Sequence, residues 1–92
     1  MDYVWDEAKR EENRRKHGVD FADAVGALED PFSLTTEDPD ARQEVRLVTI
    51  GHGLDQNLLL VVWTERDEES IRIITARRAS PGEARHYNEQ LP

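Results

Sequence analysis

The sequence predicts an α+β fold, in which an antiparallel sheet of three to five strands carries two N-terminal helices and one C-terminal helix. Two capped helical segments come first, strand-forming runs rich in β-branched residues follow without a helix between them, and a third capped helix closes the chain. Because the helices do not alternate with the strands, an α/β fold is disfavoured. We expect residues 1–92 to form a single domain.

The N-terminal segment predicts a short edge strand followed by a surface helix. Tyr3–Trp5 is apolar and extended in character, and Asp6 is suited to cap a helix that runs to about His17. Gly18 fits the left-handed position that ends such a helix. Since Ala8 is its only apolar residue, we expect this helix to lie on the surface or against something polar.

The second predicted helix begins after Asp20 and ends at Asp30-Pro31, because the residue before a proline avoids the helical region. Its apolar residues fall on one stripe. These are Phe21, Ala24, Val25 and Leu28. A short strand is expected at Ser33–Thr36.

Three strands are predicted next, at Glu44–Gly51, Leu58–Glu65 and Ser70–Arg77. The middle one is apolar on both faces, which places it at the centre of the sheet. Strict alternation along the last strand puts Arg72 and Arg77 on opposite faces.

An arginine of this strand that points to the core would need a carboxylate partner, for which Glu65 and Glu83 are candidates. The last helix starts at Ser80, with Pro81 in its first turn and Glu83 completing a capping box.

Composition restricts the classes of chemistry. The net charge is −8, with no cysteine, no paired histidine ligands and no glycine-rich phosphate loop, so we expect neither a metal nor a cofactor. The acidic excess lies mainly in residues 1–44, whereas the segment from Ile71 onward is locally basic. No signal peptide or membrane span is evident, and a cytoplasmic location is expected.

Some polar residues could carry chemistry, although each also has an ordinary structural explanation. His17 ends the first helix, where the helix dipole favours its protonated form. Lys9, Asn13 and Lys16 share one helix face, which is also typical of a solvated surface. Glu65-Arg66 ends the apolar central strand beside a turn, where functional groups often lie, but a surface ion pair would look the same.

Four ordered blocks of the sequence resemble the BrnT family of toxins. The first runs from Trp5-Asp6 through Lys9 and Asn13 to Lys16-His17-Gly18-Val19 and Phe21; the others are Asp30-Pro31 with its acidic loop, Gly51 with Leu59–Arg66, and Ile71–Ala79 with Glu83 and Tyr87. Thr75 stands where members of the family usually have serine.

The resemblance implies a RelE-like fold and an RNA-cleaving activity that blocks translation. It also implies a BrnA-like antitoxin, a ribbon–helix–helix protein that neutralises the toxin in a hetero-oligomer. The antitoxin would make the DNA contacts, so that this chain meets DNA only through it. A basic antitoxin would suit the acidic surface of the chain.

Metal-free RNA cleavage by the ribose 2′-hydroxyl needs a base, an acid and cations at the phosphate. On the family-matching positions we expect Glu65 to act as base and Arg66 and Arg77 to hold the phosphate. His17 or Lys16 would serve as acid or positioning cation. Further RNA contacts are expected from Lys9, Arg72 and Arg78. The site should then lie where Glu65-Arg66 and Arg77 meet the His17 end of the first helix.

Two other functions remain open at this level. One is a non-catalytic module that has kept the fold and antitoxin binding, which the −8 charge favours. The other is a DNA-binding regulator, which is disfavoured because the basic cluster Arg14–Lys16 shares its helix with Glu7, Glu11 and Glu12.

Overall fold

The computed structural model describes all 92 residues. Five strands form a single sheet in the order β1-β5-β4-β3-β2. In chain order the elements are β1 (Asp2–Val4), α1 (Glu7–His17), α2 (Phe21–Glu29), β2 (Leu34–Glu37), β3 (Leu47–His52), β4 (Leu58–Asp67), β5 (Ser70–Arg78) and α3 (Pro81–Glu89). The α+β class, the number of helices and the central position of β4 agree with the sequence-based prediction.

The sheet is mixed, because β1 pairs with β5 in parallel while all other neighbours are antiparallel. The expectation of an antiparallel sheet therefore holds for every pair except this one. Tight turns enforce antiparallel pairing only between strands that follow one another. Because β1 and β5 come from the two halves of the chain, no such turn constrains their direction.

A β-bulge in β5 overturns the predicted alternation of its side chains. Trp63 of β4 pairs with Ile73, but the next pair is Val62 with Thr75, so that Ile74 is the extra residue. An inserted residue shifts the side chains beyond it to the other face. As a result Arg72 and Arg77 lie on the same face of the sheet rather than on opposite faces.

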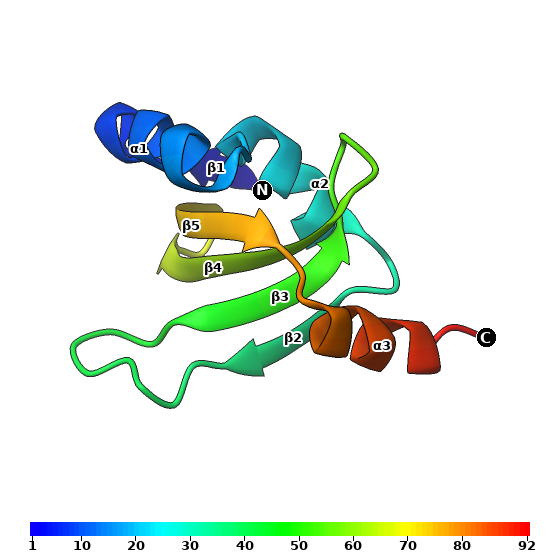
Figure 1. Ribbon diagram of the computed structural model, residues 1–92. Helices are drawn as coiled ribbons and strands as arrows, with labels where there is room; N and C mark the ends of the chain where they lie inside the picture. Colours follow the sequence, from blue (N-terminus) through cyan, green and yellow to red (C-terminus); the bar gives the residue numbers. More distant parts are fainter.

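The core lies between the sheet and the two N-terminal helices, which cover one face of it (Figure 1). Its fully buried residues come from both layers, namely Val19, Phe21, Ala24, Ala27, Leu59, Val61, Ile73 and Ala76. Gly51 of β3 allows the close approach of α2, since a Cβ atom there would stand 2.4 Å from the carbonyl oxygen of Ala27. The predicted apolar stripe of α2 is thus the buried side of that helix.

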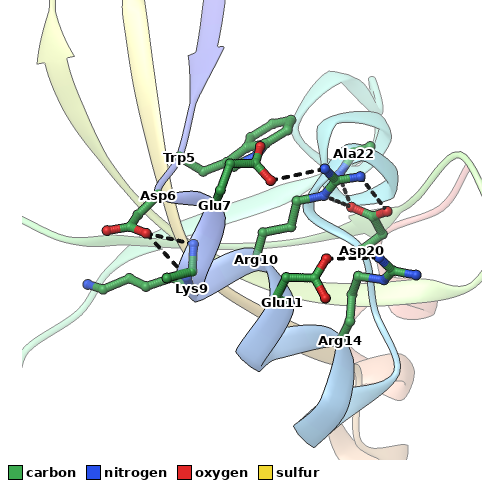
Figure 2. Close-up of polar contacts among 10 residues, drawn as sticks. Trp5, Asp6, Glu7, Lys9, Arg10, Glu11, Arg14, Asp20 and Ala22 are labelled. Atoms are coloured by element: carbon green, nitrogen blue, oxygen red, sulfur yellow. Dashed lines mark hydrogen bonds and ion pairs between the residues drawn. The ribbon is translucent and has the colours of Figure 1, made fainter.

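The surface helix α1 is held to α2 by a charge network at its N-terminal half. Arg10 donates two hydrogen bonds to Asp20, at 2.8 and 3.0 Å, and a third to Glu7 (Figure 2). Asp20 also caps α2 through the backbone N–H of Ala22, as predicted. The Arg10 guanidinium lowers the pKa of Asp20 to about 2.

The third helix lies on the other side of the sheet, near the end of β3 (Figure 1). Tyr87 anchors it: the ring is buried, and its hydroxyl donates a 2.6 Å hydrogen bond to Asp30. Burial and the bond to Asp30 raise the pKa of Tyr87 to about 12. Ser80 and Glu83 form the predicted capping box. None of the three helices is long and apolar enough to cross a membrane.

Candidate active site

A hollow of about 220 Å³ lies where α1 runs along the edge of β5. It is lined by Lys9, Glu12, Asn13, Lys16, His17, Ile74 and Thr75. Three of the residues expected to contact RNA, Lys9, Lys16 and His17, therefore meet here because they project from one face of α1.

Asn13 fixes the wall of this hollow by joining α1 to β5. Its side-chain amide donates to the carbonyl oxygens of Val19 and Ala76, at 2.9 and 2.8 Å. Its oxygen accepts from the Ala76 N–H and the Thr75 hydroxyl, both at 3.1 Å. The amide of Asn13 thus pairs with Ala76 as a neighbouring strand would, on the stretch of β5 that β1 does not reach.

The hollow holds more positive than negative charge. Lys16 forms an exposed ion pair with Glu12 at 2.8 Å, which lowers the pKa of that carboxyl below its usual range. Lys9 takes part in no ion pair, and its side chain extends away from the Arg10–Asp20 network (Figure 2). One ammonium group at the hollow is therefore available to an anion without breaking an existing pair.

The guanidinium group of Arg77 is already paired with a carboxylate. Its guanidinium donates to both oxygens of Glu83, at 2.8 and 2.9 Å, and this pair joins β5 to the start of α3. The hydrogen bonds from Arg77 lower the pKa of Glu83 to about 2. Glu83 was expected as a possible partner of an arginine on the core side of β5. Arg77 does pair with it, but its side chain is 41% exposed and lies on the face opposite the core residues Ile73 and Ala76.

Arg72 is also paired, with Glu44 of the segment that precedes β3. Its Nη2 atom lies 3.0 and 3.2 Å from the two carboxylate oxygens. Arg78, at the end of β5, is exposed and belongs to no ion pair. Of the three β5 arginines that were expected to bind RNA, Arg72 and Arg77 are therefore paired with carboxylates and Arg78 is not.

Glu65 and Arg66 do not meet Arg77, so the expected convergence of these residues at the His17 end of α1 is wrong. Glu65 pairs with Ile71 near the β4–β5 turn, whereas Arg77 pairs with Leu60. At a rise of about 3.3 Å per residue, Leu60 and Glu65 lie roughly 16 Å apart along β4. Glu65 and the partner of Arg77 thus lie toward opposite ends of β4, a separation that residue types alone do not reveal.

The surroundings of Glu65 and Arg66 are acidic. Both are exposed, and the turn that follows adds Asp67, Glu68 and Glu69. Such a cluster repels a phosphate backbone. This end of the sheet is therefore unfavourable for an anionic ligand, whereas the α1–β5 hollow has an excess of positive charge.

Two polar lining residues, Glu12 and Thr75, were missed as site candidates from the sequence, as was the apolar Ile74. Glu12 shares the helix face of Lys9 and Lys16, so helical spacing alone gives a signal for it. Thr75 directly follows the bulge residue Ile74, a position for which the sequence gives no signal. In the described chain there is no group of three or more His, Cys, Asp or Glu side chains placed to hold a metal ion.

Comparison with known proteins gives consistent results. A family model described as the ribonuclease toxin BrnT of type II toxin–antitoxin systems matches residues 5–83. The chain is similar to the crystal structure of the Brucella abortus ribonuclease toxin BrnT, at 32% sequence identity and a TM-score of 0.64. That likeness covers 87% of this chain and 97% of the Brucella chain. No curated protein sequence matches the chain significantly. By the extent of the family match and the agreement of the fold, the chain belongs to the BrnT family of ribonuclease toxins of type II toxin–antitoxin systems.

Proposed function

We propose that this chain is a metal-independent endoribonuclease that cleaves RNA in the α1–β5 hollow and thereby inhibits translation. The observation that carries the proposal is the meeting of Lys9, Lys16 and His17 beside the Thr75 hydroxyl. Cleavage by 2′-hydroxyl attack requires proton transfer and stabilisation of a phosphorane-like transition state. The hollow offers groups for both tasks.

Lys9 and Lys16 would hold the scissile phosphate. Lys9 has no carboxylate to displace, and Lys16 would exchange Glu12 for a phosphate oxygen. Because exposed ion pairs contribute little, that exchange costs little. Ammonium groups beside the phosphate supply the positive charge that the transition state needs.

His17 would transfer the proton, because imidazole is the side chain that most readily exchanges a proton near neutral pH. The role of base, first given to Glu65, passes to His17 because Glu65 lies at the far end of β4. Glu12 is a weaker base than an ordinary carboxylate, since Lys16 lowers its pKa. The remaining proton transfer, to the leaving 5′-oxygen, would then fall to a lysine or to the imidazolium itself.

A BrnA-like ribbon–helix–helix antitoxin would neutralise the chain. A toxin of a type II system has an antitoxin partner, and a basic partner would complement the net charge of −8. Contacts with DNA would be made by that antitoxin.

A non-catalytic antitoxin-binding module is the second candidate. It is favoured by the occupied guanidinium groups of Arg72 and Arg77, which Glu44 and Glu83 neutralise. In such a protein the surface would bind the antitoxin and leave RNA intact.

One experiment separates the two candidates. The purified chain is incubated with total RNA in excess EDTA, and the ends of the fragments are mapped. The proposed function predicts new 5′-hydroxyl and 2′,3′-cyclic phosphate ends that disappear when a BrnA-like antitoxin is added. If the RNA stays intact both with and without divalent metal, the chain is not a ribonuclease and the non-catalytic binding module is the remaining candidate.

A further inference from the structure

A second hollow, of about 620 Å³, lies between β5 and the segment that leads into β3. Its lining includes three arginines, Arg42, Arg46 and Arg72, together with Glu44 and Asp40. Neither Arg42 nor Arg46 takes part in the cleavage chemistry proposed above. Three guanidinium groups in one hollow are typical of a place where a phosphate or carboxylate binds.

Glu44 occupies this hollow as an anion would. Arg72 donates to both of its oxygens at 3.0 and 3.2 Å, and the Nε of Arg46 lies 3.4 Å from one of them. The three side chains are between 37% and 41% exposed, so solvent screens the pairs and their net strength is low. Arg42 joins no ion pair and keeps its donors available.

This hollow and the α1–β5 hollow both border β5. Arg72 lies on the face of the sheet that also carries Thr75, and Thr75 lines the other hollow. Because Ile74 is an extra residue, Arg72 and Thr75 lie opposite Thr64 and Val62 of β4, which are two residues and about 7 Å apart along the strand. A single RNA strand that crosses β5 can therefore place one phosphate in each hollow.

We propose that the hollow of Arg42, Arg46 and Arg72 binds a phosphate of the RNA away from the scissile bond, and that the Glu44 carboxylate holds the place of that phosphate in the free protein. The proposal rests on the proposed function for its ligand. A phosphodiester offers two unesterified oxygens to Arg72, as the Glu44 carboxylate does, and can recruit Arg42 in addition. RNA binding then displaces Glu44 from the guanidinium groups.

The test measures binding apart from cleavage. The probe is a short single-stranded 2′-O-methyl oligoribonucleotide, which lacks the attacking hydroxyl, and its dissociation constant is measured over a range of KCl concentrations. Glu44→Gln should tighten binding about threefold or more, because the occupant loses its charge. Its matched control is Glu11→Gln, which removes a carboxylate paired with Arg14 on the outer side of α1.

The converse variant removes a cation. Arg42→Gln should weaken binding about threefold or more and should lower the slope of log Kd against log salt by about 0.7, the value for one phosphate contact on a single strand. Arg15→Gln removes an exposed cation of α1 that lines neither hollow and should leave the slope unchanged.

The outcomes are distinct. Equal affinities for Glu44→Gln and Glu11→Gln, or equal slopes for Arg42→Gln and Arg15→Gln, overturn the second phosphate site. If a polyglutamate peptide binds at this hollow and the oligonucleotide does not, the hollow serves an acidic protein segment and the assignment to RNA is wrong. If the chain shows the predicted binding but cleaves no natural RNA, the proposed ribonuclease function is wrong and the second phosphate site is still supported.

Discussion

Arg72 and Arg77 point to the same face of β5, although they are an odd number of residues apart and a regular strand would separate them. Ile74 is the reason, because it is the extra residue of a bulge opposite Trp63. Thr75 follows this bulge, and its hydroxyl donates a 3.1 Å hydrogen bond to Asn13 of α1. The local irregularity of one strand therefore arranges the candidate RNA-binding surface.

Lys9→Gln is expected to lower kcat/KM for RNA cleavage about tenfold, because Lys9 is the unpaired ammonium group of the α1–β5 hollow. The measurement is the initial rate of cleavage of a fluorescent RNA at subsaturating concentration. Arg15→Gln is the control, since it removes the same charge from the same helix but outside the hollow. Equal losses in both variants would show that only net charge matters.

Asn13→Ala is expected to destabilise the protein by about 2–4 kcal/mol. The substitution leaves the buried carbonyls of Val19 and Ala76 and the N–H of Ala76 without their hydrogen-bond partner. The free energy of unfolding in urea measures this. The control is Asn88→Ala on an exposed position of α3, for which a change within about 0.5 kcal/mol is expected. A similar small change at Asn13 would contradict its role in closing the edge of β5.

Asp20→Asn is expected to cost about 1–2 kcal/mol at neutral pH and nothing at low pH. Folding lowers the pKa of Asp20 to about 2 through Arg10, from an ordinary value of about 4. The contribution of the carboxylate is therefore complete above about pH 4 and is lost as the pH falls toward 2. Urea unfolding of both proteins at several pH values gives the difference. A gap that stays constant down to pH 2 would rule out the Arg10–Asp20 pair as its source.

Tyr87→Phe is expected to cost about 1–3 kcal/mol, because Asp30 loses a 2.6 Å hydrogen bond. Folding raises the pKa of Tyr87 to about 12, so its contribution is present below about pH 10 and is lost as the pH rises toward 12. The wild type should therefore lose its advantage over the variant in that alkaline range, as measured by thermal unfolding. Tyr3→Phe, which removes an exposed bond to Glu29, should cost less; an equal cost would contradict the anchoring role of Tyr87.

Local signals in the sequence predicted the local structure well. Asp6, Asp20 and Ser80 cap helices as expected, and Gly18 ends α1 with a φ of 69°. These features depend on hydrogen bonds between near neighbours, which residue type and spacing determine. The common face of Lys9 and Lys16 could be predicted for the same reason.

Features that depend on distant contacts could not be predicted in this way. The bulge at Ile74 has no marker residue, and it reversed the expected face of Arg77 relative to Arg72. Glu65 looked functional because it ends an apolar strand, but the length of β4 places it far from Arg77. The direction of β1 likewise depends on a pairing between the two halves of the chain.

The most direct test of the account compares His17→Gln with His86→Gln in single-turnover RNA cleavage. His17 lines the hollow at which cleavage is proposed, whereas His86 is an exposed residue of α3. Both variants lose one imidazole, and circular dichroism checks that both remain folded. We expect His17→Gln to slow cleavage by about a hundredfold or more and His86→Gln to cleave at the rate of the wild type. Wild-type cleavage by His17→Gln would contradict the placement of the chemistry in the α1–β5 hollow.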